Sequence, residues 1–161
     1  MTDENNILSP LFLDEKEVRK LIELLFFSYR DFTAEADEFL ERLKFGRVHH
    51  RIIYFVGKNK RITIKELIKV LQITKQSLTR ILHQLVEQNY IKVSIGNDKR
   101  TKNIELTSKG NELEKKLSDI QIKRIRDILN DADEKDINGF KKILYKMINS
   151  QGKKIFNSIN T

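Results

Sequence analysis

The sequence predicts a mainly α-helical fold with a small β-hairpin, organised around a winged helix-turn-helix lobe. Three observations lead to this prediction. Apolar residues recur at three- and four-residue spacings along most of the 161-residue chain, which holds only one Pro and six Gly. Two short helical segments with capping residues follow one another across a tight turn. Two short strand-like segments come directly after them.

The first predicted element is a long helix over residues 14–43, preceded by a flexible N-terminus over residues 1–13. Its apolar residues cover more than one face, because Leu24, Phe26 and Phe27 fall outside the main stripe. We therefore expect this helix to be buried from two sides, by its own domain and by a partner chain.

A shorter helix and a brief strand follow. Val48, Ile52, Ile53 and Val56 give the helix its apolar face, and Gly57 with the polar residues 58–60, "KNK", is expected to close it. Residues 61–64, "RITI", then read as the strand.

The helix-turn-helix is predicted from its capping residues. Thr63 stands at an N-cap position, and Glu66 three residues later completes a capping-box pattern. Thr74 is a second N-cap and opens the helix 74–88. Asn89 is expected to end that helix in a left-handed conformation.

The hairpin "YIKVSI…NIEL" forms the wing, and further helices complete the chain. A long helix is expected from Thr107 to about Leu129. Asp133 can cap a last helix with an apolar side up to Ile148. The tail after Gln151 is expected to be ragged.

Composition and charge limit the function. The absence of cysteine excludes disulfides, thiolate metal sites and cysteine nucleophiles. Residues 42–110 carry 16 basic and 4 acidic side chains, whereas residues 1–41 carry 4 and 11. This distribution favours nucleic acid as the partner of the middle segment. No apolar run is long enough to span a membrane and no signal peptide is evident, so we expect a cytoplasmic protein.

One face of the predicted helix 74–88 has the chemistry of a DNA-reading surface. Arg80 can pair with guanine, Gln76 with adenine, and Thr79 with a thymine methyl group or a phosphate. The full candidate set on this helix is Thr74, Lys75, Gln76, Ser77, Thr79 and Arg80. An ordinary solvated helix face is the alternative, because such faces are common on amphipathic helices. The basic tip of the adjoining hairpin favours DNA.

The hairpin and the helix before it resemble the multiple-antibiotic-resistance regulator family of bacterial winged-helix repressors and activators, usually called MarR. The family's wing pattern is Asp-x-Arg followed by Leu-Thr-x-x-Gly. Its positions here are Asp98, Arg100, Leu106, Thr107 and Gly110. In the helix, the resemblance rests on Ser77, Leu78, Thr79 and Arg80.

The resemblance implies a homodimer that binds a pseudo-palindromic DNA operator. Its N- and C-terminal helices, residues 14–43 and 108–157, would form an intertwined dimerisation domain, and residues 44–107 the DNA-binding domain. Helix 74–88 would read the major groove and wing 96–103 the minor groove. There Asp98 would orient Arg100, which enters the groove, and Lys99 and Lys102 would add contacts to the DNA.

A ligand site is a further hypothesis, because many relatives bind a small, often aromatic, effector between the dimer helices and the DNA lobes. The candidate lining is Phe26, Phe27, Tyr29, Phe32 and Tyr54. Simple packing in the core is the more usual role of aromatic residues at helical spacing.

The remaining motifs argue against other classes of function. His49 and His50 point about 100° apart on a helix, so they are poorly placed to share a metal ion. We expect one to pack and the other to contact phosphate or an interface. Neither a catalytic set nor a glycine-rich phosphate loop is present, so no enzymatic activity and no cofactor are expected. The open alternative is a winged-helix module that binds protein or RNA without operator specificity.

Overall fold

The computed structural model describes residues 13–96 and 100–160. The chain forms two compact units, residues 1–35 and residues 36–161. The predicted flexible N-terminus falls almost entirely on residues 1–12, outside the described residues. None of the described helices has the length and apolar character that crossing a membrane requires.

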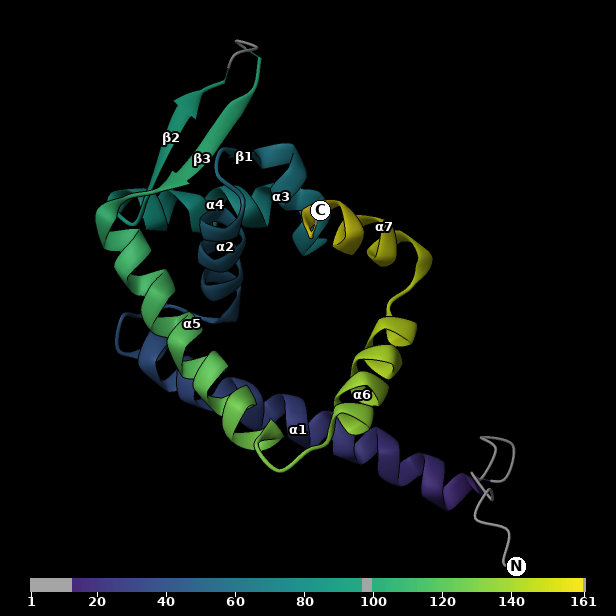
Figure 1. Cartoon of the computed structure of the whole chain (residues 1–161). Helices are drawn as coiled ribbons and strands as arrows, with labels where there is room; N and C mark the ends of the chain where they lie inside the picture. Colours follow the sequence, from purple (N-terminus) through teal and green to yellow (C-terminus); the bar gives the residue numbers. More distant parts are fainter. Residues whose placement is uncertain (1–12, 97–99, 161) are drawn as a thin grey trace, which may run out of the picture. The chain divides into compact units, whose positions relative to one another are not determined.

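The fold is mainly α-helical with a small antiparallel sheet, as the sequence predicts (Figure 1). The elements are, in chain order, α1 (Glu15–Glu41), α2 (Arg47–Lys58), β1 (Ile62–Thr63), α3 (Ile64–Leu71), α4 (Lys75–Glu87), β2 (Ile91–Ile95), β3 (Lys102–Leu106), α5 (Ser108–Leu129), α6 (Glu134–Met147) and α7 (Ser150–Ile159).

The sheet ties the helix-turn-helix to the wing. Its strand order is β1-β3-β2, and both pairings are antiparallel. Ile104 lies opposite Ile62 of β1 on one side and opposite Val93 of β2 on the other. The predicted hairpin is therefore present, and β1 pairs with it directly before α3 begins.

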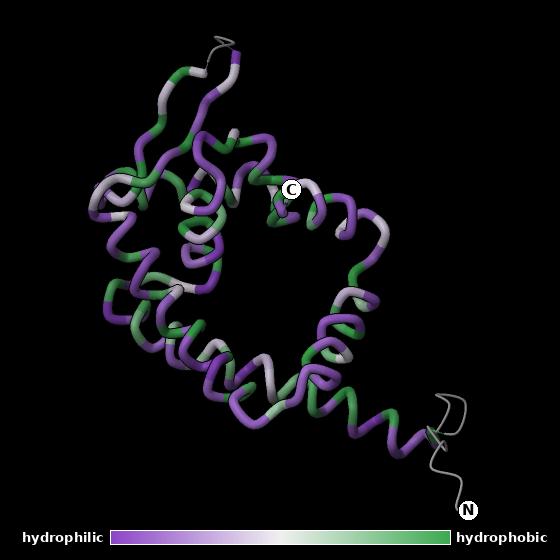
Figure 2. Tube along the Cα trace, in the orientation of Figure 1, coloured by the Kyte–Doolittle hydropathy of each residue, from purple (hydrophilic) through white to green (hydrophobic). Residues whose placement is uncertain are grey.

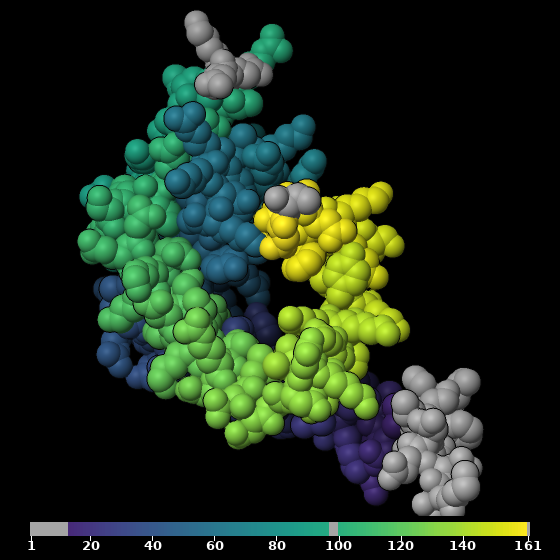
Figure 3. All heavy atoms as spheres, in the orientation of Figure 1, coloured from purple at the N-terminus to yellow at the C-terminus, as the bar shows by residue number. Residues whose placement is uncertain are grey.

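The core of the second unit lies where the end of α1, the winged lobe and the start of α5 meet. Side chains from several elements are fully buried there: Leu40, Ile52, Ile53, Leu67, Leu78, Leu85, Ile91, Ile104 and Leu117. Burying a side chain of this size stabilises a fold by about 1.5–3 kcal/mol. Figure 3 shows the beginning of α5 packed against the lobe. Helix α4 is therefore part of the packed core, and the wing projects from it (Figure 1).

The local signals for helix ends are confirmed. Thr63 Oγ1 accepts from the Glu66 backbone N–H at 3.2 Å, and the Glu66 carboxylate accepts from the Thr63 backbone N–H at 2.8 Å. These bonds lower the pKa of Glu66 below its ordinary value, the side-chain hydrogen bond from Thr63 being the largest cause. Asn89 has a φ of 60°, the left-handed conformation expected of it.

One sequence-based expectation about the C-terminus is wrong. The tail after Gln151 is not ragged, because residues Ser150–Ile159 form α7. The Asn149 side chain caps α7 by accepting from the Gly152 N–H at 2.7 Å, and Lys58 Nζ donates to Asn160 Oδ1 at 2.5 Å. Helix α2 ends at Lys58, within the stop that Gly57 and the polar residues 58–60 were expected to form. A Cβ at Gly57 would lie 2.9 Å from Glu114 Cγ, so this glycine allows close packing against α5.

Apolar side chains remain exposed on helices of both units. In α1 they include Leu24 (63% exposed) and Phe26 (64%), and in α6 Ile143 (62%) and Met147 (56%). Figure 2 shows apolar residues recurring along both helices. Exposed apolar surface of this kind is typical of a protein–protein contact.

Candidate nucleic-acid interface

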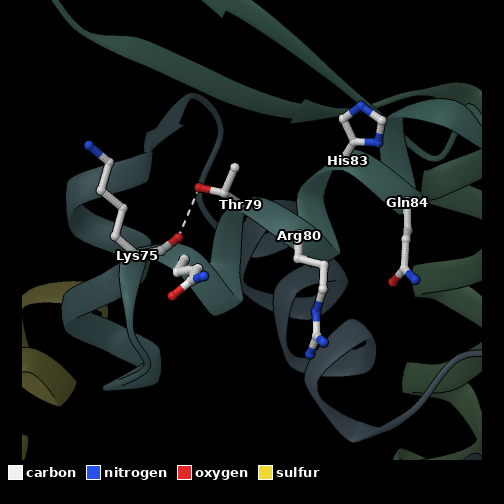
Figure 4. Close-up of a pocket in the computed structure, with 6 residues that line it drawn as sticks. Lys75, Thr79, Arg80, His83 and Gln84 are labelled. Carbon is white, nitrogen blue, oxygen red and sulfur yellow. Dashed lines mark hydrogen bonds between the residues drawn. The ribbon is translucent and has the colours of Figure 1, made fainter.

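Helix α4 has one buried face and one exposed polar face. Leu78, Ile81, Leu82 and Leu85 are buried in the core. The opposite face forms an open depression lined by Lys75, Gln76, Thr79, Arg80, His83 and Gln84 (Figure 4). The helix therefore presents a polar surface whose orientation is fixed by the apolar residues behind it.

The N-terminus of α4 is held by the predicted cap. Thr74 Oγ1 accepts from the Ser77 backbone N–H at 3.1 Å and lies 2.9 Å from Ser77 Oγ. A Thr cap of this kind is worth about 1 kcal/mol. Thr74 and Ser77 thus have a structural role in addition to any contact with a ligand.

The exposed side chains of α4 differ in whether they already form a hydrogen bond or an ion pair within the protein. Thr79 Oγ1 donates to the Lys75 carbonyl oxygen at 2.8 Å, as the dashed line in Figure 4 shows. His83 Nδ1 lies 3.4 Å from Glu87 Oε2. Within the described part of the chain, the side chains of Gln76 and Arg80 have no hydrogen bond or ion pair. Their polar groups can therefore meet a ligand without breaking an internal contact.

The end of α4 is joined to the wing and to α5 by one compact set of contacts. Thr107 Oγ1 donates to the Asn89 carbonyl oxygen at 2.6 Å and accepts from the Gly110 N–H at 3.0 Å. Lys109 Nζ donates to the Gln88 carbonyl oxygen at 2.9 Å. A Cβ at Gly110 would lie 2.0 Å from the Tyr90 carbonyl oxygen. The Thr-x-x-Gly sequence thus fixes the wing relative to α4.

The wing carries basic side chains near the start of β3 and a cluster of charged side chains at its base. Lys102 is exposed at the start of β3, and Arg100 is exposed two residues before this strand. Asp98 and Lys99 lie outside the described residues, so the proposed bracing of Arg100 by Asp98 stays a prediction. At the base of the wing, Glu105 pairs with Lys92 (3.1 Å) and Arg61 (3.3 Å). The pKa of Glu105 is lowered, chiefly by its hydrogen bond from Lys92.

The two adjacent histidines occupy different surroundings. His49 stacks on Phe45 with a centroid distance of 4.6 Å, and its Nε2 lies 2.9 Å from Gln84 Oε1. His50 is half-buried, and this burial lowers its pKa, while the nearby Asp37 raises it. Among the described residues, no three His, Asp or Glu side chains gather as a metal site.

The aromatic residues of the hypothetical ligand cleft come from both units. Phe26, Phe27 and Tyr29 are exposed on α1, Phe32 on the same helix is half-buried, and Tyr54 is exposed on α2. Phe26 and Phe27 meet edge to face at 5.3 Å. The cleft stays a prediction.

Sequence reasoning missed Gln84 as part of the polar face. Its spacing from Gln76 and Arg80 carries the signal, because residues four apart lie on the same side of a helix. The contact between His49 and Gln84 could not be read from the sequence, since 35 positions separate them.

Comparison with known proteins identifies the family. The MarR family model matches residues 44–101, which contain the helix-turn-helix and the wing up to the start of β3. The helix-turn-helix-type transcriptional regulator PetP of Rhodobacter capsulatus is 40% identical over 139 residues, covering 86% of this chain and 84% of PetP. The chain belongs to the MarR family. It is a transcriptional regulator by this relationship and not an enzyme.

Solved structures of MarR-type proteins have the same fold. FabT of Streptococcus pneumoniae, solved in complex with DNA, has a TM-score of 0.73 at 21% identity and covers 81% of this chain and 94% of its own. A MarR protein from Peptoclostridium difficile has a TM-score of 0.69 at 20% identity, covering 91% and 94%. The winged helix-turn-helix fold predicted from the sequence is therefore confirmed.

Proposed function

We propose that this MarR family regulator binds a pseudo-palindromic DNA operator as a homodimer, through helix 74–88 in the major groove and wing 96–103 in the minor groove. The observation that carries the proposal is the polar face of α4. Gln76 and Arg80 project from a helix that is capped at its start and buried on its other side. FabT, which has the same fold, was solved in complex with DNA, and this supports DNA as the partner.

The roles of the two binding elements differ. On α4, Arg80 pairs with guanine O6 and N7 and Gln76 with adenine N6 and N7, because these are the bidentate pairings that the major groove permits. Thr74, Lys75, Ser77 and Thr79 contact phosphates or thymine methyl groups. In the wing, Arg100 enters the minor groove, oriented by Asp98, and Lys99 and Lys102 contact phosphates.

A homodimer is the second part of the proposal. The exposed apolar residues of α1 and α6 are more than a folded monomer leaves in water without a cost in solubility. We assign residues 14–43 and 108–157 to an intertwined dimerisation region and residues 44–107 to DNA binding. Two copies of α4 then meet two half-sites of the operator.

Two further features belong to this proposal. The regulator acts in the cytoplasm, where bacterial DNA lies. A small aromatic effector would bind beside Phe26, Phe27, Tyr29, Phe32 and Tyr54, and titration of the dimer with aromatic acids, followed by DNA release, tests that site.

Competition binding tests the function against its alternative. The duplex is first selected by its binding to the protein, from genomic DNA of the source organism, and is then labelled. Random duplex, structured RNA and heparin compete with it for the protein at moderate salt. We expect that, at low competitor concentration, only an unlabelled copy of the selected duplex displaces the labelled one. Equal displacement by RNA or heparin would instead indicate a winged-helix module without operator specificity.

A further inference from the structure

We infer that His49 is a positioning residue for the recognition helix: it holds Gln84 so that the amide NH2 group of Gln84 faces a phosphate oxygen of the DNA. The inference rests on the proposed function and adds two residues to it. It is carried by three contacts of His49, none of which involves the previously predicted site residues.

The imidazole ring of His49 is held in one orientation. Its Nδ1 accepts from the backbone N–H of Gly46 at 3.1 Å, at the start of α2. Its face stacks on the buried Phe45 ring, with 11° between the planes. Phe45 is itself fixed edge to face against Tyr90 at 5.3 Å. The ring is thus held by contacts on two sides.

This arrangement determines which ring nitrogen of His49 carries the proton. A backbone N–H can only donate, so Nδ1 must be unprotonated and the neutral ring carries its proton on Nε2. Nε2 lies 2.9 Å from Gln84 Oε1, which can only accept. The amide of Gln84 therefore points its oxygen at His49, and its NH2 group is the end left for another partner.

Gln84 lies where this NH2 group can meet DNA. It shares the polar face of α4 with Arg80, one turn earlier, and with Gln76, two turns earlier. Figure 4 shows the side chains of Arg80 and Gln84 pointing to the same side of the helix. Base edges are reached from the N-terminal part of a recognition helix, so a donor this far along is placed for the phosphate backbone.

Two substitutions at His49 separate the contact with Gln84 from the other contacts. In His49→Asn, the side-chain oxygen can still accept from Gly46, but the amide is too short to reach Gln84. In His49→Gln, the oxygen of the longer amide can accept from the Gly46 N–H, as Gln does at this position of a capping box, and its NH2 group can extend toward Gln84. Both variants lose the stack on Phe45, so the two differ only in the contact with Gln84.

The test is a double-mutant cycle in the full-length protein, measured as the Kd for a selected operator duplex and for a random duplex. We expect His49→Asn and Gln84→Met each to weaken binding to both duplexes by about tenfold, because a phosphate contact carries no sequence information. His49→Gln should stay within about twofold of wild type. The double variant His49→Asn, Gln84→Met should bind no more weakly than Gln84→Met alone.

Three results would overturn the inference. They are equal losses in His49→Asn and His49→Gln, losses that multiply in the double variant, and wild-type affinity in a folded His49→Asn. If wild-type protein bound no duplex, the proposed function would fail instead. The contact between His49 and Gln84 can still be tested without DNA, by nitrogen NMR of the protein alone. The spectrum must show His49 with its proton on Nε2, and a proton on Nδ1 would overturn the inference.

Discussion

Gly110 and Gly139 both lie within helices, yet their surroundings differ. A Cβ at Gly110 would lie 2.0 Å from the Tyr90 backbone oxygen, whereas nothing lies within 4 Å of a Cβ at Gly139. We therefore predict that Gly110→Ala lowers the free energy of unfolding by roughly 2 kcal/mol or more. Gly139→Ala should raise it by up to about 1 kcal/mol, because Ala favours the helix.

Urea denaturation of the two glycine variants measures this difference. The two substitutions add the same methyl group, so each serves as the control for the other. Equal changes in the free energy of unfolding would show that the contact with Tyr90 does not constrain the junction between α4, the wing and α5.

His50 gives the fold a predicted dependence on pH. Burial holds the pKa of His50 below its ordinary value of 6.5, against the opposing effect of Asp37. The unfolded chain therefore binds a proton at a higher pH than the folded chain does. Stability is full above about pH 6.5 and falls as the pH drops toward the lower folded pKa.

Replacing His50 by Gln should flatten this loss of stability with acid. The thermal midpoint of wild type and of His50→Gln, measured from pH 7.5 to pH 5, checks the prediction. A variant curve as steep as that of wild type would show that other groups cause the loss.

Substitutions in the recognition helix and in the wing should change DNA binding in different ways. Arg80→Ala on α4 should weaken binding to the operator far more than to random DNA, at a cost of about 1–3 kcal/mol, because Arg80 is assigned to a base. Lys102→Ala on β3 should weaken both alike and reduce the slope of log K against log salt by about one. Titrations at several salt concentrations distinguish the two patterns. A Lys102→Ala variant with an unchanged slope would remove the wing contact from the proposal.

The helices and strands could be predicted where the residues that define them lie close together in the sequence. Thr63, Thr74 and Asn89 mark helix ends through groups within three residues of each, and the structure confirms all three. α7 was missed because its "NSQG" start reads as a polar turn and its apolar residues are few. Its contacts with α3 and Lys58 are distant in the sequence, as is the contact between His49 and Gln84. Pairings of this kind need the tertiary structure.

At the scale of the whole molecule, the exposed apolar surface predicts the dimer. Ile143 and Met147 lie four residues apart on one side of α6, and both are more than half exposed. Charged residues at both positions, in the double variant Ile143→Glu, Met147→Glu, should convert the proposed dimer to a monomer with a folded winged lobe. Light scattering measures the mass. Substitution of the exposed lysines at 141 and 142 by Glu is the control for added negative charge on the same helix.

A monomer should bind the operator much more weakly, because it meets one half-site at a time. A wild-type protein that is monomeric at micromolar concentration, or a monomeric variant with unchanged operator affinity, would contradict the dimer.

Footprinting on the protein's own promoter DNA tests the central claim most directly, since it reports specificity and symmetry together. We predict two protected half-sites, related by a two-fold axis and about one helical turn apart. They should be protected at a concentration at least about a thousandfold below that needed for random DNA. Protection that spreads evenly along the fragment, at the concentration that covers random DNA, would contradict the claim.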